Sequence, residues 1–467
     1  MGPGTFKLLF LGLMGSGLPV AIAMSGASLI YVMTTGNIPD YVVIHRMVGG
    51  LDSFPLLAVP FFILAGNLMN SAGITNRIYN FALALVGWMK GGLGHVNVVG
   101  SVIFAGMSGT AIADAAGLGT IEIKAMTEHG YSKEFAVGVT AASATLGPII
   151  PPSLPFVIYA LFANVSVGAL FLAGILPGVF MAILMMITVA YYAHKNKWGA
   201  DIPFQWPRVL KAFGELAIVL GWPTAIYYLI QAGSQPQLTV LIGLAILFGA
   251  DWKFKFNAVL PLMTPVLLIG GMTTGVFTAT EGAIAACVWA LVLGLGYYRT
   301  MPLKKLIKVS MDTIETTAAV LFIVAAASIF GWMLTATRTT EMIATWVLSV
   351  VSTPAGFLLL ANLLMLFVGC FLEPTAAITI LVPILLPIVH KLGIDPVHFG
   401  LVMVLNLMIG LLHPPMGLVL FVLARVAKLS VERTTMAILP WLVPLLISLV
   451  IVTYIPAISL WLPSQFR

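Results

Sequence analysis

Two helix breakers lie inside strongly apolar sequence between Gly106 and Ser153, and they constrain the fold more than any other feature of the chain. The first is Gly106-Met107-Ser108-Gly109-Thr110, and the second is Gly147-Pro148-Ile149-Ile150-Pro151-Pro152-Ser153. Glycine and proline in such runs interrupt the hydrogen bonding of a helix. Backbone amides and carbonyls freed at membrane depth cannot face lipid, so a helix broken there has to line a cavity and hold something polar.

The same pattern occurs a second time, 263 residues further along the chain. The residues that coincide at this offset are Gly106 with Gly369, Gly130 with Gly393, Gly147 with Gly410, Pro151 with Pro414 and Pro152 with Pro415. One pair of breakers in each half is typical of transporters built from two structural repeats. We expect the repeats to be inverted, with the two breaker pairs meeting midway through the bilayer. The alternative is that the breaks are kinks that only relieve packing.

The composition places the chain in a membrane. Hydrophobic residues make up 60% of the sequence, charged residues only 8%, and the mean hydropathy is +1.07. A span takes about 20 apolar residues, so there is room for roughly a dozen spans and some re-entrant pieces. We therefore predict an all-α polytopic membrane protein. The net charge of +6 comes from scattered short loops, which indicates topology rather than nucleic-acid binding.

Two kinds of interrupted element are expected in each half. Apolar segments on both sides of the Ser108-Gly109 break are shorter than a full span, which predicts a re-entrant hairpin within 94–124. The second hairpin is expected within 362–391. Segments 135–162 and 399–426 are predicted to be discontinuous helices that unwind in the middle. Residues 213–250 have no counterpart in the first half, and we expect them to form an extra helical pair.

These elements divide the chain into five parts. They are the scaffold and arm helices of repeat 1 (1–93), hairpin 1 with the rest of repeat 1 (94–193), a basic loop with the extra pair (194–256), the scaffold and arm helices of repeat 2 (257–353), and hairpin 2 with the closing helix (354–467). The basic loop is expected on the cytoplasmic side. The segment 299–308 and its counterpart around His45-Arg46 are both basic, so charge bias does not decide their orientation.

The breaks supply the ligand types that a hard cation such as sodium requires, because unwound carbonyls and hydroxyls provide several oxygens without several buried charges. The candidate ion-binding residues are Ser108, Gly109, Thr110, Asp114, Gly147, Pro148, Pro151, Glu373, Thr375, Gly410 and Pro414. The candidate substrate-binding residues are Ser108, Thr110, Ser153, Thr375 and Met416. Half-helices that begin near Thr110 and Thr375 would direct their N-terminal dipoles at an anionic substrate.

Four acidic residues lie in or beside apolar sequence, where a carboxylate is costly and suggests function: Asp114, Glu281, Asp312 and Glu373. Thr278-Ala279-Thr280-Glu281 has the spacing of a capping box, so Glu281 either caps a helix or acts near the site or at a hinge. Asp312 follows a basic amphipathic piece and is better explained as an interface charge. His390 and His413 are interpreted as structural, because no paired histidines support proton coupling.

Stretches in several parts of the chain resemble the large membrane subunit (M or DctM type) of tripartite ATP-independent periplasmic (TRAP) transporters, in the ion transporter superfamily. The matching stretches are 55–69, Ser108-Gly109-Thr110-Ala111-Ile112-Ala113-Asp114, 147–153, 172–178, 275–281 and Phe371-Leu372-Glu373-Pro374-Thr375. They occur in the family order. No P-loop is present, so the chain does not energise transport with ATP by itself.

The resemblance implies an elevator-type transporter in the bacterial inner membrane, with a scaffold and a mobile transport domain that carries two hairpins. It implies coupling to sodium, with at least two ions, and no other cofactor or enzymatic activity. It also implies a separate small membrane subunit (Q type) and a periplasmic binding protein that delivers an organic acid such as a dicarboxylate or sialic acid. Glu281 matches a functionally sensitive acid of the family. The extra pair 213–250 departs from its usual pattern.

Two other interpretations remain open at this level. The chain could be a stand-alone ion-coupled carrier of organic anions that needs neither partner. It could also be a scaffold or sensor that keeps the fold and transports nothing, in which case replacing Thr110, Asp114 or Glu373 would leave its function intact.

Overall fold

The computed structural model describes residues 3–36, 38–231, 236–254, 259–273, 276–351, 353–413 and 417–465. Within these ranges the regular structure is helical, and strand-like pairing is limited to one isolated bridge between Lys90 and Ala200. The all-α class predicted from the sequence is confirmed.

The first half of the chain forms a series of mostly short helices. They are α1 (Pro3–Gly15), α2 (Val20–Thr35), α3 (Tyr41–Gly49), α4 (Ala58–Ser71), α5 (Ile74–Val86), α6 (Gly92–Ser108), α7 (Ala111–Ala116), α8 (Leu118–Glu128), α9 (Lys133–Ala144), α10 (Leu154–Ala163) and α11 (Val167–Lys195). Both expected breaks are present, since α6 ends at Ser108 and the chain is unwound between α9 and α10.

The extra pair and the second half follow. The pair is α12 (Trp206–Gln231) and α13 (Pro236–Phe254). The second half comprises α14 (Val259–Thr273), α15 (Ala279–Leu291) with a π-helical end (Val292–Tyr297), α16 (Leu303–Ala336), α17 (Thr339–Val350), α18 (Pro354–Gly369), α19 (Pro374–Lys391), α20 (Pro396–Gly410), α21 (Leu418–Ala427), α22 (Val431–Tyr454) and α23 (Ala457–Gln465). The interruptions between α18 and α19 and between α20 and α21 match those of the first half.

Helix caps repeat between the halves at the offset found in the sequence. Thr110 caps α7 and Glu373 caps α19, while Ser132 caps α9 and Asp395 caps α20. Gly130 and Gly393, which precede α9 and α20, both adopt left-handed conformations with φ of 86° and 67°. Because caps fix where a helix starts, the two halves share one local framework although few of their other residues agree.

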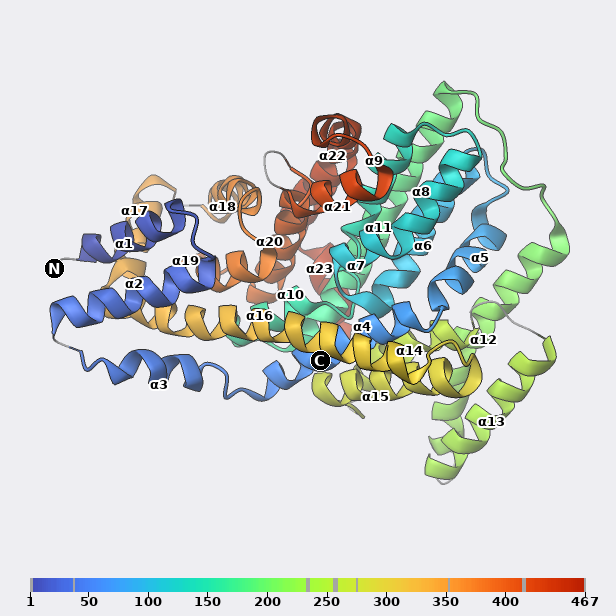
Figure 1. Ribbon diagram of the computed structural model, residues 1–467, viewed down its shortest axis with the longest axis horizontal. Coiled ribbons are helices and arrows are strands. Elements are labelled where there is room, and N and C mark those ends of the chain that lie inside the picture. The colour runs from blue at the N-terminus through green and yellow to red at the C-terminus, as the bar shows by residue number, and fades with distance from the viewer. Residues whose placement is uncertain are drawn as a thin grey trace.

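The two halves also exchange equivalent contacts. Helix α10 packs against α19, and its counterpart α21 packs against α7, which follows the tip of the first hairpin. Likewise α9 packs against α22, and α11 packs against α20, as seen around α9 and α22 in Figure 1. This reciprocity is the packing expected of two halves related by an approximate twofold axis.

The long helix α16 extends along the molecule and packs against α2, α3, α4 and α19 (Figure 1). The equivalent part of the first half is divided into α3, a short 3₁₀ helix (Phe54–Leu57) and α4. Pro55 lies in the 3₁₀ helix, whereas Ala318 occupies its place in α16 at the offset of 263 residues. Proline lacks the N–H that helix continuation requires, so the first half bends where the second continues.

Only a minority of the described helices are long enough to span a membrane. Five helices in the described ranges are long and apolar enough to cross a bilayer, or up to seven if each bent pair counts as one span. Much of the remaining apolar sequence is in helices of 10–17 residues, including α6, α10, α20 and α21. The structure is therefore a multi-pass membrane fold with interrupted helices.

The C-terminal end is divided into two helices, whereas one closing helix was expected. Helix α22 ends at Tyr454, and α23 begins at Ala457. Pro456 disfavours a helical conformation at the preceding residue, Ile455, which accounts for the interruption.

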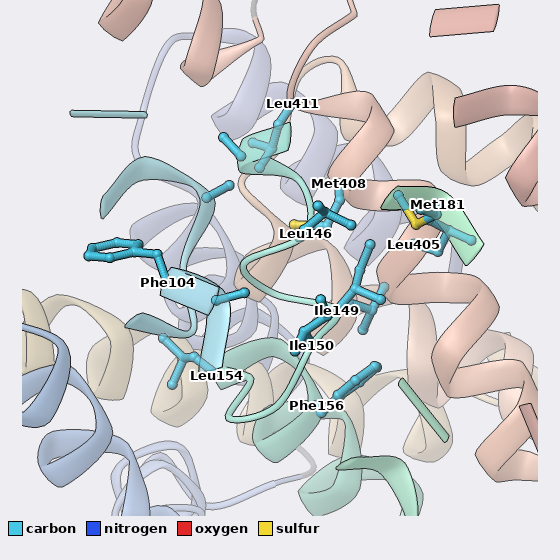
Figure 2. Packing of buried hydrophobic residues seen from close by; sticks show 14 of the residues in the cluster. Phe104, Leu146, Ile149, Ile150, Leu154, Phe156, Met181, Leu405, Met408 and Leu411 are labelled. Carbon is cyan, nitrogen blue, oxygen red and sulfur yellow. The ribbon is translucent and has the colours of Figure 1, made fainter. Parts of the chain in front are cut away.

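The unwound segment between α9 and α10 lies within the hydrophobic core. Figure 2 shows Leu146, Ile149 and Ile150 of this segment together with Phe104, Phe156, Met408 and Leu411. Leu146 and Ile149 are fully buried. Apolar packing thus holds the unwound backbone in place.

Candidate functional site

The tip of hairpin 1 is a tight turn between α6 and α7. Ser108 ends α6, Gly109 is left-handed with φ of 64°, and Thr110 is extended. A β-carbon on Gly109 would lie 2.7 Å from the carbonyl oxygen of Pro152. Both the positive φ and this close approach require glycine at the tip.

The tip contacts the unwound segment and α4 through backbone atoms. A β-carbon on Gly147 would lie 3.0 Å from the carbonyl oxygen of Thr110, and one on Gly66 would lie 3.1 Å from that of Ser108. Carbonyl groups of Ser108, Thr110 and Pro152 therefore lie at the contacts that join the tip to its neighbours. Oxygens of this kind are suitable ligands for a hard cation.

Ser108 contributes the most available side-chain group at this tip. Its hydroxyl is buried and has no hydrogen-bond partner within the described part of the chain. Buried polar atoms are normally paired, so this hydroxyl is a candidate contact for a bound species.

Two other predicted hydroxyls already have local partners. Thr110 Oγ1 accepts a hydrogen bond of 3.2 Å from Ala113 N and so caps α7. Ser153 Oγ donates to the carbonyl oxygen of Pro148 and accepts from Phe156 N, so it stabilises the unwound segment and the start of α10. Binding through either hydroxyl remains a prediction.

The tip of hairpin 2 is built around a carboxylate. Glu373 caps α19, with Oε2 accepting from Ala376 N at 3.4 Å, while Thr375 Oγ1 donates to Glu373 Oε1 at 2.7 Å. The two residues predicted for this tip are therefore in contact. The negative charge of Glu373 already lies at the N-terminus of α19, where an anionic substrate group was expected.

Hairpin 2 meets its own broken helix directly. A β-carbon on Gly410 would lie 2.7 Å from Gly369 Cα, and Cys370 Sγ lies 3.3 Å from His413 Nδ1. Both halves thus bring a hairpin tip against an unwound segment. Pro414 and Met416, which the sequence proposed for the ion and substrate sites, lie outside the described residues.

The half-helix expected after Thr110 is shorter than its counterpart after Glu373. Helix α7 has 6 residues and stops at Gly117, whereas α19 has 18. Gly117, with φ of −85° and ψ of −83°, separates α7 from α8. Because a helix dipole sums aligned peptide units, the arrangement favours an anion less at α7 than the sequence suggested.

The remaining acids have different surroundings. Asp114 is buried on α7, and its Oδ2 has no hydrogen-bond partner among the described residues. Glu281 forms the capping box anticipated from its spacing: Oε2 accepts from Thr278 N at 2.8 Å, and Glu281 N donates to Thr278 Oγ1 at 3.3 Å. Asp312 is exposed on α16.

The sequence analysis did not single out the buried acid Glu122. Glu122 on α8 is only 1% exposed, and its Oε2 accepts a 2.6 Å hydrogen bond from Asn97 Nδ2 of α6. Glu122 lies two residues before Lys124, where a polar run begins. The sequence analysis interpreted that run as a loop that returns to water. Its position in the same arm of the hairpin as Asp114 could have identified Glu122 as a second acid in apolar sequence.

Comparison with known proteins identifies the family. A sequence model of the DctM component of tripartite ATP-independent periplasmic transporters matches residues 8–458. The chain belongs to this family. The DctM-type chain is 41% identical to the sialic acid TRAP transporter large permease protein SiaM of Vibrio cholerae, with 98% of this chain and 97% of the relative covered. It is 36% identical to the C4-dicarboxylate TRAP transporter large permease protein DctM of Pseudomonas aeruginosa, covering 95% and 94%.

Solved structures support the fold. The YdaH transporter of Alcanivorax borkumensis superposes with a TM-score of 0.59 at 13% identity, covering 96% of this chain and 97% of that one. MtrF of Neisseria gonorrhoeae gives 0.58 at 11% identity, covering 93% and 94%. The resemblance drawn from the sequence is confirmed, and this DctM-type chain is a component of a transporter rather than an enzyme.

Proposed function

We propose that this chain is the large membrane subunit of a sodium-coupled secondary transporter that takes up a small organic acid. The observation that carries the proposal is the contact between the tip of hairpin 1 and the unwound segment. There the Ser108 hydroxyl, which has no partner among the residues that the structure describes, lies in a tip whose carbonyls approach the unwound chain.

One sodium ion would bind between this tip and the unwound segment. Oxygens of Ser108, Gly109 and Thr110, together with carbonyls of Gly147, Pro148 and Pro151, supply neutral ligands on two elements. A second ion would bind at the equivalent place in the other half. Its ligands would be drawn from Glu373, Thr375, Gly410 and Pro414.

The substrate is an organic anion. The relatives named above are a sialic acid and a C4-dicarboxylate permease, and both substrate classes carry carboxylates. Bound sodium would complete the tips and supply positive charge near the hydroxyls of Ser108, Thr110, Ser153 and Thr375. Substrate would then be held more firmly when sodium is present, which couples the two fluxes.

Two partner proteins would complete the system in a bacterial inner membrane. The family describes a tripartite transporter, and this chain spans only 64% of the isethionate TRAP transporter permease protein DctMQ of Oleidesulfovibrio alaskensis. We therefore assign a small Q-type membrane subunit and a periplasmic substrate-binding protein as partners. A stand-alone carrier would transport without either.

Uptake into vesicles tests this function. The reconstituted complex should accumulate a substrate carboxylate only with an inward sodium gradient, and Ser108→Ala should abolish most of that uptake. Thr120→Ala is the matched control, because the exposed Thr120 lies in the same hairpin and donates only to the carbonyl oxygen of Ala116. Uptake that ignores sodium would remove the coupling, and uptake by this chain alone would favour the stand-alone carrier.

Transport would proceed by an elevator movement. The hairpins, the broken helices, α11 and α22 would form the transport domain, and α1–α4 with α14–α16 would form the scaffold. The packing of α9 against α22 and of α4 against α15 and α16 supports this division. Gly331 of α16 faces Pro383 of α19 across the proposed boundary, and a β-carbon on Gly331 would lie 3.8 Å from Pro383 Cβ. That separation suits a disulfide, for which the mean is about 3.8 Å.

Cross-linking tests the movement. Gly331→Cys with Pro383→Cys, in a chain without Cys287 and Cys370, should lose uptake on oxidation and recover it on reduction. The single variants, oxidised alone, should keep their uptake. Full uptake by the cross-linked pair would show that α16 and α19 do not separate during transport.

A further inference from the structure

Two loop segments join the first half of the proposed transport domain to the rest of the chain. Residues 87–91 lead from α5 into α6, the first arm of hairpin 1, and residues 196–205 lead from α11 to α12. Helix α11 packs against α6 and α20 of the proposed transport domain, whereas α12 packs against α14 of the proposed scaffold. Any movement between the two domains therefore has to be accommodated at or beyond these two segments.

The two segments pair with each other. They run antiparallel, with an isolated bridge between Lys90 and Ala200. Gly91 N donates to the carbonyl oxygen of Gly199 at 2.9 Å. Gly91 has a φ of 70°, and a β-carbon on it would lie 2.7 Å from Ala193 Cβ of α11, so this close crossing requires glycine. The segments thus form one paired linker, residues 87–91 with 196–205.

Contacts continue along the paired linker towards α12. Ile202 N donates to the carbonyl oxygen of Gly87 at 3.4 Å. The rings of Trp88 and Phe204 meet edge to face, with their centroids 5.0 Å apart. Aromatic rings attract each other in this geometry, so the side chains add to the backbone pairing.

Asp201 fastens the paired linker to hairpin 1. Its Oδ2 accepts from Leu93 N, in the first turn of α6, at 2.8 Å and from the Tyr131 hydroxyl at 2.6 Å. Tyr131 lies in the turn that follows α8, the other arm of the hairpin. The carboxylate therefore connects the ends of both arms that lie away from the tip. Its negative charge also lies at the N-terminus of α6, where it is favourable.

Hairpin 2 begins differently, because its first arm carries its own cap. Thr353 Oγ1 accepts from Gly356 N at 3.2 Å at the start of α18. The residue before α6 is Gly91, which has no side chain that could act as a cap. Asp201 of the paired linker supplies an acceptor to α6 instead, so the start of hairpin 1 depends on where the linker lies.

We infer that Asp201 is a positioning residue for transport: it fastens the paired linker to hairpin 1, so that both segments move with this hairpin as one unit. The inference rests on the elevator movement proposed above. The chain then bends beyond the paired linker, and the two hydrogen bonds of Asp201 persist through the cycle. Segments that separated would have to break their pairing in every cycle.

Cross-linking the two segments tests whether they move together. Because the hydrogen bond joins the residues next to them, Lys90 and Ala200 form a non-hydrogen-bonded pair with Cα atoms about 4.5 Å apart, within the disulfide range of about 4.4–6.8 Å. Both side chains are exposed. Lys90→Cys with Ala200→Cys, in a chain without Cys287 and Cys370, should oxidise readily in the reconstituted complex and keep its uptake. The single variants, oxidised alone, are the controls.

The cross-linked chain with Gly331→Cys and Pro383→Cys separates failure of this inference from failure of the proposed function. Loss of uptake in that chain, with uptake kept by the cross-linked linker, would support both. Loss of uptake on oxidation of the linker pair, or a pair that does not oxidise, would overturn the inference alone. Uptake by both oxidised chains would overturn the elevator movement, and the movement of the linker with it.

Replacing Asp201 tests its role as a positioning residue. Asp201→Ala removes the acceptor for Leu93 N and for the Tyr131 hydroxyl, so the linker has to be ordered again in each cycle. The maximal rate of uptake should fall several-fold, while the sodium and substrate concentrations that give half-maximal uptake change little. Asp201→Asn, which keeps an oxygen that can accept both hydrogen bonds, should retain most of the rate. Gln205→Ala, exposed in the same segment, is the matched control.

A rescue experiment distinguishes loss of the fastening from a general loss of structure. In the Asp201→Ala chain, oxidation of the Lys90→Cys and Ala200→Cys pair should restore much of the maximal rate, because the disulfide fastens the linker at the start of α6. A chain that is only less well folded would stay slow after oxidation. An unchanged rate in Asp201→Ala, or no recovery on oxidation, would overturn the role assigned to Asp201.

Discussion

Hairpin 1 and hairpin 2 occupy equivalent places in the two halves, yet they carry different polar groups. Helix α8 of the first ends at Glu128 and α19 of the second at Lys391, 263 residues apart. Between tip and end, hairpin 1 carries Asp114 and Glu122, where hairpin 2 carries alanine and leucine. The repeat thus preserves where the arm after each tip ends, while the acidic residues along the two arms differ.

The tips differ in the same way. Thr110 and Glu373 are equivalent caps, one neutral and one acidic. Gly109 makes a left-handed turn at the first tip, whereas Leu372 takes its place at the second. At the first tip, the neutral cap lies two residues after Ser108, whose hydroxyl has no partner among the described residues. At the second tip, the acidic cap already accepts a hydrogen bond from Thr375.

The largest effect is expected from Gly109→Ala. A left-handed alanine costs about 1–2 kcal/mol, and its β-carbon would lie 2.7 Å from the Pro152 carbonyl oxygen. Forcing extra atoms into such a contact costs about 1–3 kcal/mol more. We expect uptake to be lost because the tip separates from the unwound segment. Uptake by the reconstituted complex at matched expression is the measurement.

Gly130→Ala is the control for this prediction. Gly130 is also left-handed, but no atom lies within 4 Å of the added β-carbon, so only the conformational cost applies. It should keep most of its uptake. Equal losses in both variants would show that backbone strain, and not the contact with Pro152, accounts for the effect.

Many of the helix boundaries could be predicted from the sequence. Glycine and proline fix where helices stop, so the breaks at Ser108, between α9 and α10 and between α20 and α21 were predicted, as were the extra pair and the Glu281 capping box. The continuity of α16 was not predicted, because matching halves by offset gives no weight to the replacement of Pro55 by Ala318.

The polar contacts inside the hairpins could not be predicted in the same way. Glu122 is one acid among apolar residues, and only the folded chain shows that Asn97, 25 residues earlier, lies against it. The sequence also does not show which hydroxyl groups already have a hydrogen-bond partner. Ser108 and Ser153 look alike in sequence, but Ser153 is used as a cap while Ser108 has no partner among the described residues. Such distinctions arise from tertiary contacts and not from local pattern.

The smallest effect is expected from Glu373→Gln, which separates the two roles of the hairpin 2 cap. Glutamine keeps one oxygen that can accept from Ala376 N, and its NH2 group can donate to the Thr375 hydroxyl in place of the second carboxylate oxygen, so the start of α19 should stay intact. The main change is the loss of the negative charge. If Glu373 contributes that charge to the second sodium site, the sodium concentration that gives half-maximal uptake should rise several-fold, while the melting temperature without sodium changes little.

Thr110→Ser, which preserves the neutral cap of hairpin 1, should alter neither quantity. An unchanged sodium dependence in Glu373→Gln would mean that this carboxylate only caps α19. Ion binding would then be restricted to hairpin 1, because the second tip would need no charge.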